Sequence, residues 1–144
     1  MSEQRVYPMI DYEDAVGAIE FLTTAFGFVE DRERRYTEPD GRISHAQLSL
    51  DGGSIMLGGS IDGYQGPDHH ASTCDHARAW LDTPYIVDGV LCYVDDVAAH
   101  FERARAAGAR ILSEIEEGFP GTRYRAADLE GHRWMFMQRE AAQG

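Results

Sequence analysis

The chain has 144 residues, and its 43% hydrophobic and 10% aromatic content predicts one folded domain and excludes an intrinsically disordered chain. The formal net charge is −12 and all 13 basic residues are arginines, which argues against a nucleic-acid partner because phosphate binding needs clustered positive charge. No apolar run is long enough to span a membrane, and two cysteines do not make a disulfide framework, so we expect a cytoplasmic protein with no membrane partner.

The first half of the chain predicts a strand, a helix and three further strands. Residues 6–12 alternate in polarity, as a strand does, and the next apolar residues recur at helical spacing between Asp14 and the stop signal Gly27. Three strand-like segments joined by turn sequences follow, at 28–36, 42–50 and 54–58. The predicted order is βαβββ, and we call residues 5–58 module one.

The second half repeats this order after a segment of different character. Residues 59–85 are rich in Gly, Asp and His, and we expect a linker or lid loop with at most a short helix at 77–81. Beyond it the sequence predicts a strand, a helix capped by Asp95 or Asp96 and ended by Gly108, and three strands. These predicted segments are 86–94, 95–109, 110–115, 122–129 and 132–138.

Module two, residues 86–138, aligns with module one residue against residue. The matching positions are Asp14 and Asp96 before the helix, Gly27 and Gly108 after it, and LDGGSIML (50–57) and LEGHRWMF (129–136) at the last strand. The alignment sets Met56 against Met135. Each module is too small to bury both faces of its sheet, so we expect the modules to pair within the chain or between chains.

The paired modules resemble the vicinal oxygen chelate superfamily, which includes glyoxalase I, extradiol dioxygenases, fosfomycin-resistance enzymes and bleomycin-resistance proteins. The resemblance rests on the order of DYEDAVGAIEFLTTAFGF, VDDVAAHFERARAAGA and DLEGHRWMF, and it extends over residues 5–138. It implies an α+β fold in which two tandem βαβββ modules form a curved, cup-like mixed sheet. It also implies a homodimer, since a second chain often completes the cups of this family.

The resemblance implies four positions at which metal-using members carry His, Glu or Gln ligands. Here those positions hold Tyr7, Met56, Gly89 and Met135. A thioether is a soft ligand, a phenol is a poor one unless it is deprotonated, and glycine has no side chain, whereas catalytic divalent ions of this kind bind imidazole and carboxylate. We therefore expect no metal ion and no other cofactor in the cup.

The sequence thus favours a metal-free small-molecule-binding protein of the bleomycin-resistance type, a class that serves antibiotic resistance. The predicted ligand-binding residues would line the cup with apolar, aromatic and a few polar side chains: Tyr7, Met9, His45, Gln47, Met56, Leu91, Tyr93, Tyr124 and Met135. Aromatic rings and methionines suit an aromatic ligand. The negative charge, with eight aspartates between Asp51 and Asp96, suits a cationic ligand, although solubility alone also accounts for it.

A glyoxalase-like or dioxygenase-like enzyme is the alternative. It would need a non-standard metal site, or metal-free chemistry with His45 or His132 as an acid or base. His132 also suits a capping or surface position. The linker holds a group of residues that a soft metal ion could bind, although their spacing matches no standard zinc motif: His69, His70, Cys74 and His76.

Module two contains two further sets of polar residues. His100 and Glu102 lie opposite Phe101 on the predicted helix, and we expect them on its solvated face. Arg123 and Arg125 flank Tyr124 in a strand of ambiguous phase, and of the three we expect Tyr124 to face the pocket.

Overall fold

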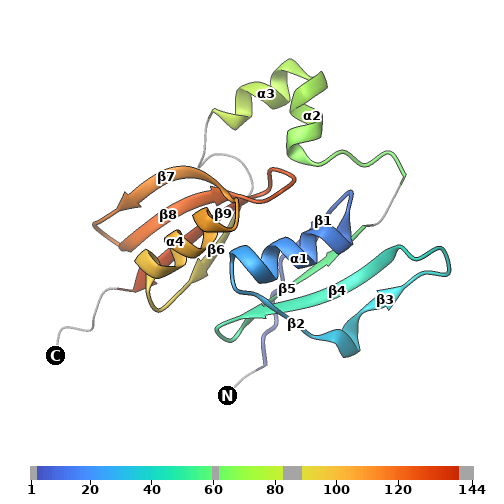
Figure 1. Cartoon of the computed structure of the whole chain (residues 1–144), viewed down its shortest axis with the longest axis horizontal. Coiled ribbons are helices and arrows are strands. Elements are labelled where there is room, and N and C mark those ends of the chain that lie inside the picture. The colour runs from blue at the N-terminus through green and yellow to red at the C-terminus, as the bar shows by residue number, and fades with distance from the viewer. Residues whose placement is uncertain (1–2, 60–61, 83–88, 140–144) are drawn as a thin grey trace.

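The computed structural model describes residues 3–59, 62–82 and 89–139, and it places two small sheets next to each other (Figure 1). The sheet of module one comprises β1 (Met9–Asp11), β2 (Val29–Glu30), β3 (Tyr36–Thr37), β4 (Ile43–Leu50) and β5 (Gly53–Gly58). The sheet of module two comprises β6 (Gly89–Tyr93), β7 (Arg110–Glu116), β8 (Gly121–Ala127) and β9 (Arg133–Arg139). The strand orders are β1-β5-β4-β2, with β3 also on β4, and β6-β9-β8-β7. In both sheets the first strand is parallel to the last, so the two share one design.

One long helix packs on each sheet, α1 (Ala15–Ala25) in module one and α4 (Val97–Ala106) in module two. In each case the side chain of the N-cap aspartate accepts a hydrogen bond of 3.0 Å from the backbone three residues on: Asp14 from Gly17 and Asp96 from Ala99. Gly27 and Gly108 follow the helices with φ of 85° and 95°, a conformation that glycine adopts without steric cost. Of the two aspartates expected as alternatives for the second cap, Asp96 is the one that caps.

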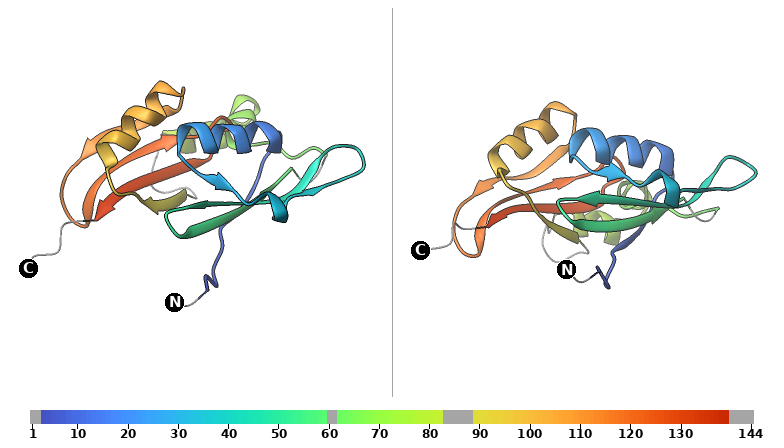
Figure 2. Two further views of the ribbon diagram at one scale, coloured as in Figure 1. Left: turned by 60° about the horizontal axis from the view of Figure 1, so that its bottom comes forward. Right: turned by 90° about the horizontal axis from the view of Figure 1, so that it is seen from below.

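The two long helices lie next to each other on the same side of both sheets (Figure 2). Arg103 of α4 donates hydrogen bonds of 3.1 Å to the carbonyls of Thr23 and Thr24 near the end of α1. Beneath the helices, the rings of Phe26 and Trp134 lie 5.7 Å apart. Residues of both modules therefore share one buried core. The burial of its apolar surface away from water supplies the main favourable contribution to folding.

The strands alternate between this shared core and a second face, which we call the open face of each sheet. In β9, Trp134 and Phe136 are fully buried in the core, and Met135 between them belongs to the open face. The two long helices leave the open face of both sheets uncovered (Figure 2). The predicted α+β class is confirmed, with two mixed sheets that each carry a long helix on one face.

Two local predictions are wrong. The predicted strand 28–36 is interrupted by a short 3₁₀ helix, η1 (Arg32–Arg34), which separates β2 from β3. The linker, expected as a loop with at most one short helix, contains two helices, α2 (Pro67–Thr73) and α3 (Asp75–Leu81). Such short helices are marginal on their own, and α2 is held by a tertiary contact, since the backbone N–H of Asp68 donates to the carbonyl of Glu130 at 3.0 Å.

The predicted limits of the two modules, 5–58 and 86–138, stay a proposal. The start of the predicted strand 86–94 lies outside the described residues, as do residues 60–61 of the linker. Within the described ranges, no helix is both long and apolar enough to cross a membrane.

Candidate functional site

The open face of module one carries four of the predicted ligand-binding residues. The strand register sets Met9 beside Met56, and Met56 beside Gln47. Paired residues of adjacent strands share a face, so these three form one row. His45 lies two residues before Gln47 on the same face, and Met9, His45 and Met56 line one cavity of about 420 Å³. The structure thus brings the four side chains together, and ligand binding by them stays a prediction.

The open face of module two carries the corresponding row. Leu91 pairs with Met135, and Met135 pairs with Arg125. The next row, by the same register, holds Tyr93, Met137 and Arg123. Leu91 and Tyr93 also line a cavity of about 370 Å³ that extends to residues 50–55 of module one. The two-fold repeat of the sequence therefore places arginines in module two where module one has Gln47 and His45.

Tyr124 does not face the pocket, contrary to the prediction. It pairs with Phe136 of β9, which fixes it on the core side, and it is fully buried there. Burial raises the pKa of its hydroxyl. Arg123 and Arg125 face the open side instead. Sequence reasoning missed both arginines because the phase of β8 depends on its pairing with β9; a single aromatic residue between two arginines was the available signal that the core buries the aromatic one.

The four family metal positions do not supply a donor set for a divalent ion. Tyr7 is half-buried in the segment before β1, Met56 lies in the module-one cavity, Gly89 begins β6, and Met135 lies in the module-two row. Thioether sulfurs, a phenol and a glycine do not fit an ion that prefers imidazole and carboxylate. Within residues 3–59, 62–82 and 89–139, no three His, Cys, Asp or Glu side chains gather closely enough to hold a metal ion, and this range includes the linker histidines and Cys74.

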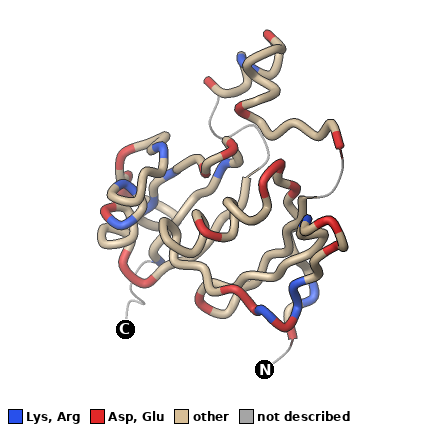
Figure 3. The backbone as a smooth tube through the Cα atoms, turned by 45° about the vertical axis from the view of Figure 1, so that its right-hand side comes forward, with Lys and Arg blue, Asp and Glu red and all other residues tan. Residues whose placement is uncertain are grey.

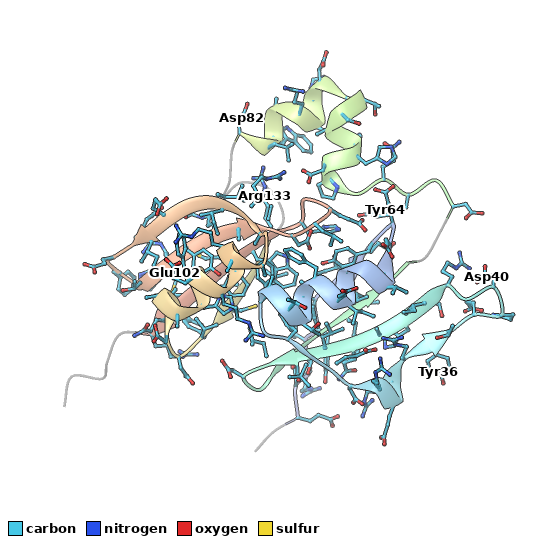
Figure 4. All side chains as sticks on the ribbon, viewed as in Figure 1. Tyr36, Asp40, Tyr64, Asp82, Glu102 and Arg133 are labelled. Carbon is cyan, nitrogen blue, oxygen red and sulfur yellow. The ribbon has the colours of Figure 1, made fainter. Side chains whose placement is uncertain are left out.

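A smaller cavity, of about 260 Å³, lies between the α2–α3 pair and the start of β9, where Figure 4 labels Arg133. Tyr64, His70, Trp80 and His132 also line it. Arg133 donates a hydrogen bond of 2.7 Å to the carbonyl of Trp80, and burial lowers the pKa of its guanidinium. Burial also raises the pKa of Tyr64 to about 12. The linker therefore borders a cavity that is lined by Arg133 and two histidines as well as by the linker's own Tyr64 and Trp80.

His132 occupies a structural position. Its Nε2 lies 2.8 Å from the carbonyl of Asp11, and since a carbonyl only accepts, this nitrogen carries the proton and donates. The imidazole also meets the ring of Tyr12 edge-on, with centroids 4.7 Å apart. His132 thus ties the end of β1 to the start of β9, which favours the capping role over acid–base chemistry.

Asp128, in the turn between β8 and β9, was not identified from the sequence. Its carboxylate is almost fully buried and accepts four hydrogen bonds, from the Tyr12 hydroxyl at 2.6 Å, the Trp134 indole at 3.1 Å and the backbone N–H groups of Glu130 and His132 at 3.0 Å. The Tyr12 hydroxyl belongs to module one, and the other three donors belong to module two. The DLEG segment is therefore a turn that joins the modules.

Glu130, in the same turn, also reaches module one. Its two carboxylate oxygens accept hydrogen bonds from the backbone N–H groups of Glu13 at 2.7 Å and Asp14 at 2.9 Å, immediately before α1. The carboxylate of Glu13 in turn accepts from the backbone of Gly66 at 2.9 Å and lies 2.8 Å from Nδ1 of His69, so that the start of α2 is attached to the same junction. The hydrogen bond from Gly66 is the main cause that lowers the pKa of Glu13, and the hydrogen bond from His69 lowers it further.

His100 was expected on the solvated face of its helix and lies between the modules instead. Its Nε2 donates to the carbonyl of Phe26 at 2.7 Å, so Nδ1 is the acceptor for the Tyr124 hydroxyl at 2.6 Å. Its ring lies 4.1 Å from the ring of Phe136. Glu102 is exposed, as expected, and pairs with Arg105 at 2.6 Å (Figure 4).

Comparison with known proteins relates the whole chain to one family of folds. An uncharacterized protein of Mycobacterium tuberculosis is 33% identical over 137 residues, which covers 94% of this chain and 75% of the relative. The crystal structure of TioX from Micromonospora sp. ML1 is 29% identical, covers 98% of this chain and 100% of that chain, and superposes with a TM-score of 0.66.

More distant structures share the fold alone. The fosfomycin resistance protein FosX from Listeria monocytogenes is 12% identical, with 97% of this chain and 94% of that chain covered and a TM-score of 0.62. A family model matches residues 8–136 of this chain. The paired modules and the sheet faces left uncovered by the two long helices agree with these likenesses. The chain therefore belongs to the Glyoxalase/Bleomycin resistance protein/Dioxygenase superfamily and has its cup-like fold.

Proposed function

We propose that this protein binds and sequesters an aromatic small molecule, without a metal ion, as a binding protein of the bleomycin-resistance type. The observation that carries the proposal is the pair of corresponding rows on the open faces: Met9, Met56 and Gln47 in module one, and Leu91, Met135 and Arg125 in module two. They offer apolar surface with a few polar groups, as small-molecule sites do. Methionines at two equivalent positions suit an adaptable contact with an aromatic ring.

The distribution of charge gives little support to a cationic ligand. Acidic residues outnumber basic ones over the chain as a whole (Figure 3). Of the linker aspartates expected to attract a cation, Asp68 is paired with Arg110 at 3.0 Å. The open face of module two presents arginines, which repel a cation. A cationic ligand stays a prediction, to be tested beside neutral and acidic compounds.

The binding proposal is tested with N-phenyl-1-naphthylamine, a neutral aromatic probe whose fluorescence rises in apolar sites. We expect saturable binding that Leu91→Asp weakens by about tenfold or more, because a carboxylate is costly to desolvate against an aromatic ring. Leu91 is 48% exposed, so the substitution leaves the core intact. Val16→Asp is the matched control, since Val16 is 56% exposed on α1, away from the open faces, and should not change the affinity.

The same titration tests the metal-free part of the proposal. Affinity measured after dialysis against a chelator should equal the affinity before it. A probe that does not bind the untreated protein, or that binds Leu91→Asp unchanged, would contradict the proposed site. Loss of binding on chelation would contradict its metal-free character and return the enzyme alternative.

We also propose that a second copy of the chain completes the pocket. Met9 is 78% exposed on the open face of module one, and Leu91 and Tyr93 are 48% and 37% exposed on that of module two. Large apolar side chains exposed at one face are typical of an interaction surface. Sedimentation equilibrium is expected to give twice the 16.1 kDa of one chain. Met9→Asp should shift the protein toward monomer and Val16→Asp should not; a wild-type monomer would refute the proposal.

A further inference from the structure

Two arginines of β8 are held on the open face of module two. Arg123 and Arg125 have side chains that are only 20% and 15% exposed. Guanidinium groups lose favourable hydration when they are half-buried, so arginine is costly at these positions unless an anion or hydrogen-bond acceptors compensate. The corresponding positions of module one hold the uncharged Gln47 and the imidazole of His45, so the design of the fold does not itself require arginine here.

One protein carboxylate lies against both arginines. Glu116 of β7 is 3.5 Å from Arg123 and 3.4 Å from Arg125, and Arg123 also donates to the carbonyl of Gly121 at 3.0 Å. Charge-assisted hydrogen bonds are usually about 2.7–2.9 Å long, so Glu116 sits loosely between the two guanidiniums. Glu116 therefore bridges the two guanidiniums without making a short hydrogen bond to either.

The same face carries two more arginines on β9. Arg133 and Arg139 fall on the side of β9 that also presents Met135, because residues two apart in a strand share a face. Arg139 lies over the ring of Tyr93, with its guanidinium carbon 3.8 Å from the ring centroid. Arg133 donates to the carbonyl of Trp80 in α3, so of these two arginines Arg139 is the one that adds positive charge to the uncovered part of the face.

Apolar surface lies directly beside the charged pair. Arg125 is the register partner of Met135, whose other neighbour is Leu91, so the backbone positions that carry the charged and the apolar side chains are one strand spacing apart. Tyr93 belongs to the next row, beyond Met137 and Arg123. A ligand that satisfies both halves of such a surface has a flat apolar body and an acidic group at one edge.

We propose that the open face of module two recognises an aromatic acid, with the carboxylate, sulfonate or phosphate group of the ligand bound by Arg123 and Arg125 and its ring body lying on Leu91 and Met135. This inference rests on the proposed binding function and adds the chemical class of the ligand. Arginine binds planar and tetrahedral oxyanions through paired N–H donors, which gives the acidic group a defined orientation. Glu116 limits the affinity, because it competes with the ligand for the same donors.

A matched pair of probes tests the inference. 8-Anilinonaphthalene-1-sulfonate and N-phenyl-1-naphthylamine share one ring system and differ in the sulfonate, and 9-aminoacridine serves as the cationic comparison. We expect the sulfonate to bind about tenfold more tightly than the neutral probe, by a margin that shrinks as salt rises. Arg123→Gln and Arg125→Gln should each weaken the sulfonate about tenfold and leave the neutral probe unchanged.

Two further variants keep the test independent of folding defects. Glu116→Gln removes the competing carboxylate and should strengthen sulfonate binding, the opposite direction to the arginine variants. Arg105→Gln is the matched control, because Arg105 pairs with Glu102 on the outer side of α4 and should change neither probe.

The outcomes separate this inference from the proposed function. If the neutral probe does not bind, the proposed function fails. If the neutral probe binds as tightly as the sulfonate, and Glu116→Gln changes nothing, the acid recognition fails while the binding function stands. Tighter binding of 9-aminoacridine than of either probe would overturn the inference in favour of a cationic ligand. Loss of the dimer in Arg123→Gln with unchanged sulfonate affinity would assign the arginines to an acidic group of the second copy.

Discussion

Replacing Asp128 by alanine is expected to lower the free energy of unfolding by about 4 kcal/mol, which is a large effect for a single substitution. The substitution leaves the buried Tyr12 hydroxyl and Trp134 indole without their acceptor, and it removes the acceptor for two backbone N–H groups of the turn. Each buried donor left unsatisfied costs roughly 1–3 kcal/mol. Urea denaturation followed by tryptophan fluorescence and by circular dichroism measures the loss.

Asp95→Ala is the control for this substitution. Asp95 is exposed and precedes the N-cap of α4, so its removal should change stability by less than about 0.5 kcal/mol. Asp128→Asn should fall between the two, because the amide oxygen replaces one acceptor while the NH₂ group opposes the donors of Tyr12 and Trp134. If Asp128→Ala unfolds at the same urea concentration as Asp95→Ala, the turn does not hold the modules together.

Acidification is expected to destabilise the protein through His100. Burial lowers the pKa of His100 from its ordinary value of 6.5, with the charge of Arg103 acting in the same direction and the hydrogen bond to Phe26 and the charge of Asp51 acting against it. The unfolded chain then binds the proton more readily than the folded one. Stability contributed by neutral His100 is present above pH 6.5 and is lost as the pH falls through the lowered folded value. Protonation also removes the Nδ1 lone pair that accepts from the Tyr124 hydroxyl.

His100→Gln tests this pH dependence. Urea midpoints measured from pH 8 to pH 5 should fall less steeply for the variant than for the wild type, because the variant has no group that titrates at this position. His70→Gln, at an exposed position of α2, should keep the wild-type slope. An equal slope in all three proteins would show that carboxylates, and not His100, set the acid response.

The alternation of residues predicted the faces of most strands and not that of β8. For β4, β5 and β9, apolar residues at every second position identified the core side, and this set Met56 and Met135 on the other side. In β8 the only aromatic residue, Tyr124, was assigned to the pocket because Gly118 and Pro120 obscure the start of the strand. Strand phase there follows from pairing with β9, a long-range contact that a single sequence does not contain.

The roles of His100 and of the linker depended on contacts between modules. A histidine on the polar side of a helix looks solvated until the partner of that side is known, and here the partner is the carbonyl of Phe26, 74 residues away. The two linker helices each have seven residues, too few for an amphipathic pattern to be recognised. Their support comes from residues such as Glu13 and Glu130, whose positions only the folded chain defines.

The carboxylate of Glu130 has a consequence for how the protein unfolds. It belongs to module two by sequence, yet it supplies acceptors to the backbone of Glu13 and Asp14 at the start of the module-one helix. Neither module can melt alone without stripping partners from buried or helix-terminal groups of the other. We therefore expect the two halves to unfold as a single cooperative unit, with equal calorimetric and van't Hoff enthalpies, rather than as two repeats that unfold in sequence.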